Sequence, residues 1–95
     1  MLDGVEPEIV DEILQVVNRV EDVKDVTEIR VRWIGHRLFA EVNIAVDPRL
    51  TVEEGHAIAV EVRQRMIKNL SYLSNVVVHV DPISLSGEAF HQSLK

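Results

Sequence analysis

The sequence contains no cysteine, so disulfide bonds and thiolate metal ligands are excluded. Any bound metal ion must therefore be held by histidine, aspartate, glutamate, asparagine or backbone oxygen. Only four glycines are present, and they are too scattered to form a glycine-rich phosphate loop. A nucleophile elbow of the serine hydrolase type is also missing. We therefore expect that the chain is not an enzyme.

Positive charge is also scarce, with 10 lysines and arginines against 16 aspartates and glutamates and a net charge of −6. Nucleic-acid binding requires a basic face, so we expect no nucleic-acid partner, whereas a cation suits an acidic chain. No apolar run approaches the roughly 20 residues of a membrane-spanning helix. The first four residues lack the basic and apolar regions of a signal peptide. Taken alone, the sequence predicts a cytosolic protein.

The length of 95 residues suits one domain, which we place at residues 1–82, followed by a flexible tail at residues 83–95. A domain of this size buries only about 60 to 65% of the surface that its unfolded chain exposes. Association with a second copy would therefore stabilise it.

Helical periodicity appears twice. In residues 7–20 the apolar positions Val10, Ile13, Leu14, Val17 and Val20 recur at helical spacing. A second helix is expected from Thr51, which fits a capping box with Glu54, to about residue 70.

Strict alternation of apolar and polar residues predicts three strands, near residues 26–34, 38–47 and 75–82. A hairpin turn at Gly35 joins the first two strands. Trp33 is expected to pack in the core, and Pro82 is expected to end the third strand.

The order helix-strand-strand-helix-strand predicts an α/β (α+β) two-layer sandwich. The crossover through the second helix places the third strand parallel to the second, which gives a three-stranded mixed sheet. Both helices then cover the sheet face that carries Leu38, Val42 and Val78. The other face stays open.

The open face carries a candidate metal site. Alternation puts His79 and Asp81 side by side on it, and Glu41 and Asn43 lie across from them if the strands are neighbours. A histidine and a carboxylate on one face form a partial site for a divalent ion. His56, in the first turn of the second helix, is the third candidate ligand.

Plainer interpretations apply to the same residues. Open sheet faces are polar in any case, and a histidine two residues before an aspartate arises often by chance. His56, His36 and His91 also suit ordinary surface positions. Phe39 lies on the open face, where burial against a second subunit would cover it.

Several segments, taken in order, resemble a known family. They are residues 2–7 (LDGVEP), 20–26 (VEDVKDV), 29–32 (IRVR) with Gly35, 46–48 (VDP), 51–56 (TVEEGH) and 77–82 (VVHVDP). Together they resemble the C-terminal cytoplasmic domain of cation diffusion facilitator metal transporters. The resemblance implies a metallochaperone-like, ferredoxin-like fold that forms a V-shaped homodimer below the membrane. It also implies that a divalent metal ion at or near the interface draws the two copies together and promotes transport.

The resemblance also implies roles for single residues. His79 and Asp81 match metal ligands on the third strand, and His56 matches a ligand at the start of the second helix. Asn43 and Thr27 stand where zinc-transporting bacterial members have histidines. These departures predict weaker or differently selective binding.

Phe39 and Glu41 stand where magnetosome-associated members place a tryptophan and an acidic residue at the central interface. Asp3 matches a charged position near the membrane junction. The resemblance thus favours the magnetosome branch over a zinc exporter. The expected ion is zinc in vitro, with iron or manganese as alternatives.

The leading prediction is a metal-sensing and homodimerisation domain of a divalent-cation transporter in an inner or magnetosome membrane. Its partners would be a second copy, its own transmembrane domain and a related transporter subunit. Two alternatives stay open. One is a purely structural dimerisation or protein-interaction domain with a vestigial metal site, and the other is a free-standing binding module.

Overall fold

Two helices and three strands alternate in the computed structural model, which describes residues 7–84. In chain order they are α1 (Pro7–Asn18), β1 (Asp25–Ile34), β2 (Arg37–Val46), α2 (Val52–Asn69) and β3 (Leu73–Pro82). The sheet order is β1-β2-β3, with β1 antiparallel to β2 and β3 parallel to β2. The predicted element order and mixed sheet are confirmed.

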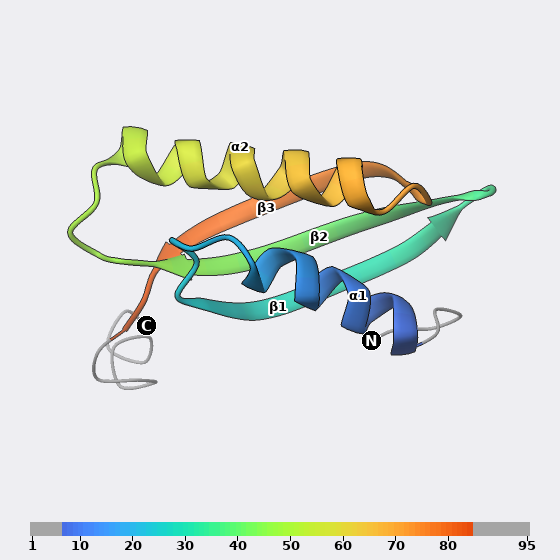
Figure 1. The fold of residues 1–95 in the computed structure, drawn as a ribbon, viewed down its shortest axis with the longest axis horizontal. Coiled ribbons are helices and arrows are strands. Elements are labelled where there is room, and N and C mark those ends of the chain that lie inside the picture. The colour runs from blue at the N-terminus through green and yellow to red at the C-terminus, as the bar shows by residue number, and fades with distance from the viewer. Residues whose placement is uncertain (1–6, 85–95) are drawn as a thin grey trace, which may run out of the picture.

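A single core fills the space between the helices and one sheet face. The alternate β2 residues Leu38, Ala40, Val42, Ile44 and Val46 are all buried there. They pack with Ile13, Val16 and Val17 of α1 and with Ile58, Val62 and Met66 of α2. Figure 1 shows α2 running along β3 and α1 crossing in front of β1. Both helices therefore cover the predicted face.

The start of α2 follows from a reciprocal cap. The Thr51 hydroxyl accepts a hydrogen bond from the Glu54 backbone N–H at 3.0 Å, and the Glu54 carboxylate accepts one from the Thr51 N–H at 2.9 Å. These two bonds satisfy backbone donors that the first helical turn would leave unpaired. The end of α1 comes earlier than predicted, because Arg19 and Val20 form turn bonds to Val16 and Val17.

The predicted core position of Trp33 is wrong, because the residue is 42% exposed. Val31, two residues earlier on the same face, is buried. The β1–β2 hairpin extends beyond both helices (Figure 1), so the helices do not reach its tip. The turn itself is as expected, with Gly35 at a φ of 64°.

β3 ends at Pro82, as predicted, although one ladder bond follows it. Pro82 pairs with Val46, and the Ile83 N–H continues the ladder with a 2.7 Å bond to the Val46 carbonyl. Since Ile83 donates toward β2, the nitrogen of Pro82 faces the free edge, where a missing N–H costs nothing. Of the predicted tail, Ile83 and Ser84 are half-buried, and the rest lies outside the described residues.

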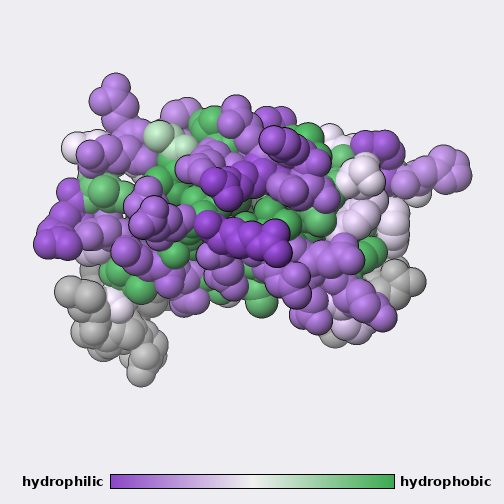
Figure 2. All heavy atoms as spheres, in the orientation of Figure 1, coloured by the Kyte–Doolittle hydropathy of each residue, from purple (hydrophilic) through white to green (hydrophobic). Residues whose placement is uncertain are grey.

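The face of the molecule seen in Figure 2 is mainly polar. In this view apolar residues are visible only in areas between charged and polar side chains (Figure 2). Within residues 7–84, no helix is long and apolar enough to cross a membrane.

Candidate metal site

The sheet face opposite the helices presents side chains from all three strands, and we call it the open face. It comprises Glu28, Arg30 and Arg32 of β1, Phe39, Glu41 and Asn43 of β2, and Val77, His79 and Asp81 of β3. The register places Arg30 opposite Glu41, and Asn43 opposite His79. No other element of the described chain covers this face.

Glu41 and His79 meet at the centre of the open face. The His79 Nε2 lies 2.6 Å from the Glu41 Oε2, with the side chains 48% and 24% exposed, respectively. Because an ionised carboxylate only accepts hydrogen bonds, the imidazole Nε2–H is the donor. This bond, with a smaller contribution from the charge of Arg30, lowers the pKa of Glu41. Glu41 is therefore an anion at neutral pH.

This hydrogen bond leaves Nδ1 of a neutral His79 with a free lone pair. A carboxylate that holds one ring nitrogen while the other binds metal is a common arrangement, because it fixes the orientation of the ring and makes it a better ligand. Glu41 can thus orient His79, or it can bind the ion directly if the ring turns. In both arrangements His79 supplies one nitrogen, and in the second Glu41 also supplies a carboxylate oxygen.

Arg30 occupies the second oxygen of the same carboxylate. Its Nη2 lies 3.4 Å from the Glu41 Oε1, and its Nε lies 3.5 Å from the Glu28 Oε2. One guanidinium therefore bridges two carboxylates. Sequence reasoning missed Arg30, although a signal for it exists. A two-residue turn at Gly35 and His36 places residues 30 and 41 directly opposite one another.

The other predicted open-face residues lie around this pair. Asp81 is exposed, two residues beyond His79 on the same face and opposite Ala45. Asn43 is half-buried, and its backbone carbonyl accepts a 3.4 Å bond from the Thr27 hydroxyl. Phe39 is also half-buried, and the guanidinium of Arg32 lies 5.3 Å from its ring centroid.

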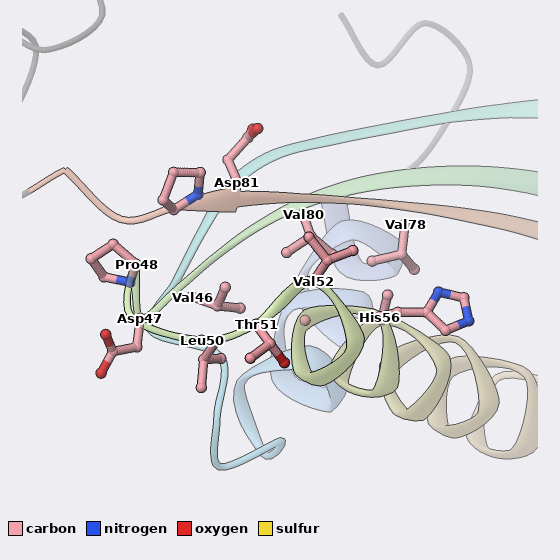
Figure 3. Close-up of a pocket in the computed structure, with 13 residues that line it drawn as sticks. Val46, Asp47, Pro48, Leu50, Thr51, Val52, His56, Val78, Val80 and Asp81 are labelled. Atoms are coloured by element: carbon pink, nitrogen blue, oxygen red, sulfur yellow. The ribbon is translucent and has the colours of Figure 1, made fainter.

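His56 lies on the other side of the sheet. It lines a pocket of about 450 Å³ between the first half of α2 and the end of β3. Figure 3 shows its ring beside Val78, on the side that the helices occupy, whereas Asp81 points away from α2. One chain therefore does not bring His56 together with His79 and Asp81. In the described part of the chain, no three histidine or acidic side chains are placed to hold a metal ion together.

Asp47, at the end of the same pocket, is already paired. Its carboxylate accepts hydrogen bonds from the Arg49 side chain at 2.8 and 3.1 Å and from the Arg49 backbone N–H at 2.8 Å. These bonds lower the pKa of Asp47 to about 2. Asp81 also lines the pocket, but its side chain points away from α2 (Figure 3), and the rest of the lining is largely apolar apart from Thr51. His56 is therefore the main candidate ligand that faces this pocket.

Comparison with known proteins gives a consistent result. Residues 5–83 match the family model for the cytoplasmic domain of cation efflux proteins. The chain is 35% identical over 82 residues to a probable cation efflux system protein of Mycobacterium tuberculosis, which covers 86% of this chain and 25% of the relative. It is 34% identical over 82 residues to the manganese efflux system protein MneP of Bacillus subtilis, which covers 86% and 28%. The chain thus spans about a quarter of the length of these curated relatives.

Among solved structures, a variant of the MamM C-terminal domain in a cadmium form superimposes with a TM-score of 0.80 at 27% identity, covering 82% of this chain and 98% of that one. Another variant in a manganese form gives 0.77 at 28% identity, covering 80% and 96%. MamM itself is a magnetosome protein of Magnetospirillum gryphiswaldense, 29% identical over 69 residues, which is 73% of this chain and 22% of MamM.

Proposed function

Because the chain belongs to the family of cytoplasmic domains of cation efflux proteins, we propose that it is the metal-sensing and homodimerisation domain of a divalent-cation transporter. The observation that supports this most is the Glu41–His79 pair at the centre of a sheet face that nothing in the described chain covers. The membrane part of such a transporter would lie in the rest of the protein. A second copy, that membrane part and a related transporter subunit are the proposed partners.

A site shared between two copies explains why one chain supplies so few ligands. Zinc usually takes four protein ligands, and manganese or iron takes more, often with water. A twofold axis through the open face would present two copies of His79 and two of Glu41 to one ion, because symmetric dimers use the same patch on both subunits. Within one described chain Asp81 does not join Glu41 and His79 around an ion, so it would add an oxygen only to a site between two copies. His56 would serve a separate, peripheral site.

The same arrangement explains how metal would close the dimer. Without metal, the carboxylates of the two copies repel one another. An ion that bridges them binds the closed state better than the open one and shifts the equilibrium by that difference in affinity. At an ion concentration 100 times the dissociation constant, the shift is about 2.7 kcal/mol, which is enough to reverse a modest preference for the open form.

The ligand types bear on the choice of ion. Asn43 and Thr27 supply oxygens, so the open face offers one nitrogen per chain. An oxygen-rich set suits manganese or iron, although zinc binds more tightly to most sites in vitro. The identities with the two efflux proteins, 35% and 34%, exceed the 29% with MamM, and support an efflux transporter. A magnetosome transporter is the alternative.

Calorimetric titration with Mn²⁺, Zn²⁺ and anaerobic Fe²⁺ tests the proposal. We expect binding in the wild-type chain, loss of the main site in His79→Ala and Glu41→Gln, and loss of only a weaker site in His56→Ala. His36→Ala is the matched control, because that histidine lies exposed in the hairpin turn. If His79→Ala bound metal like the wild type, the site would lie elsewhere. If no ion bound the wild type, a structural dimerisation domain would be the better account.

A further inference from the structure

We propose that Arg30 competes with the metal ion for Glu41. In the metal-free state its guanidinium pairs with the Glu41 carboxylate, and this raises the metal concentration needed to fill the site. This inference rests on the proposed function of the Glu41–His79 pair. It adds a residue that sets the threshold of the response without binding the ion itself.

The first argument is the occupancy of the Glu41 carboxylate. One oxygen accepts the bond from His79 at 2.6 Å, and the other faces the Arg30 guanidinium at 3.4 Å. A metal ion that takes the carboxylate must therefore displace one of the two. Keeping the His79 bond holds the ring with Nδ1 free for the ion, whereas Arg30 contributes no ligand, so Arg30 is the group that gives way.

The second argument is that Arg30 has a place to go. Its Nε already lies 3.5 Å from Glu28, which is on the same strand and the same face. The guanidinium side chain is 56% exposed, so it can leave Glu41 without unfolding any packing. It can remain with Glu28 while Glu41 turns to the ion.

The third argument is charge. A divalent cation beside Glu41 would sit close to the positive charge of an Arg30 still in place, and the two would repel. For an exposed pair, removal of the competing charge changes an equilibrium constant by about two- to fivefold. When two chains share one ion, the effects multiply to about four- to 25-fold.

Arg32 provides a matched control. It lies two residues along the same strand and on the same face, but its guanidinium lies over the Phe39 ring instead of a carboxylate. Arg30→Gln and Arg32→Gln remove the same charge from almost the same place. Only the first removes a partner of Glu41.

The test is calorimetric titration of the full chain with Mn²⁺ and Zn²⁺ in the wild type, Arg30→Gln, Arg30→Lys and Arg32→Gln. We expect Arg30→Gln to bind about four- to 25-fold more tightly, while Arg30→Lys, which keeps the charge, and Arg32→Gln stay within about twofold of the wild type. Adding His79→Ala to Arg30→Gln should abolish the tighter binding. Circular dichroism checks that each variant is folded.

Three outcomes would overturn the inference in different ways. If the wild type binds through His79 and Arg30→Gln binds no more tightly than Arg32→Gln, the metal site stands and the role of Arg30 is wrong. If no variant binds either ion, the proposed function fails and the inference fails with it. Tighter binding that survives His79→Ala would place the effect at another site and also refute the role.

Discussion

Replacing Ile44 should weaken the domain much more than replacing its neighbour Asn43. The two residues are adjacent in β2, the central strand, but point to opposite faces of the sheet. Ile44 is fully buried under the helices, whereas Asn43 is half-buried on the open face. The contrast tests the central structural claim that one face holds the fold together and the other is free for function.

The expected magnitudes follow from burial. Ile44→Ala deletes buried methyl and methylene groups and leaves a cavity, so it should cost about 2 to 5 kcal/mol. That is a large part of the stability of a small domain, which is about 5 to 15 kcal/mol in all. Ile44→Val removes one methylene and should cost about 1 kcal/mol, which lowers the melting temperature by about 4 to 8 °C. Asn43→Ala should stay within about 0.5 kcal/mol.

Thermal and urea unfolding, followed by circular dichroism without metal, would measure these differences. The experiments need a range of protein concentrations, because the stability of a dimer depends on concentration. If Asn43→Ala cost as much as Ile44→Ala at every concentration, the assignment of faces would be refuted. A cost that appeared only at high concentration would instead report burial of Asn43 between subunits.

Three further changes test local features. Thr51→Ala removes the cap of α2 and should cost about 1 kcal/mol in urea unfolding. Gly55→Ala should stabilise the domain by about 0.5 to 1 kcal/mol, because alanine is a better helix former than glycine. The added Cβ would meet Val80 at an ordinary 3.7 Å, so nothing has to move. A loss of stability would contradict this packing. The bonds from Arg49 lower the pKa of Asp47 to about 2. The ionised Asp47 carboxylate therefore stabilises the fold above about pH 4, and this stabilisation is lost as the pH falls toward 2. Asp47→Asn should therefore flatten the decline of the urea midpoint between pH 4 and pH 2 and leave its slope near pH 7 unchanged.

Much of the fold could be predicted because two periods dominate the sequence. The alternation from Leu38 to Val46 fixes which face of β2 is buried, and the helical spacing fixes which faces of the helices meet it. Trp33 shows the limit of this reasoning. Its place in the alternation gives its face correctly, but only the length of the helices decides whether anything covers that end of the hairpin.

The site was predictable to the same extent. Alternation puts Glu41 and His79 on one face, and parallel pairing of β2 and β3 brings them together. The position of His56 could not be derived in this way, because closeness along the chain to the end of β2 does not say on which side of the sheet a helical side chain lies. Arg30 is predictable from the hairpin register, but arginine is not a metal ligand, so a pattern of ligand residue types does not point to it.

Small-angle X-ray scattering of the chain with and without Mn²⁺, in the wild type and in His79→Ala, tests the proposed function most directly. We predict that the ion reduces the radius of gyration of the wild-type dimer and leaves that of His79→Ala unchanged. Equal compaction in both proteins, or none in the wild type at an ion concentration that saturates binding, would contradict the proposal that metal on the open face closes the dimer.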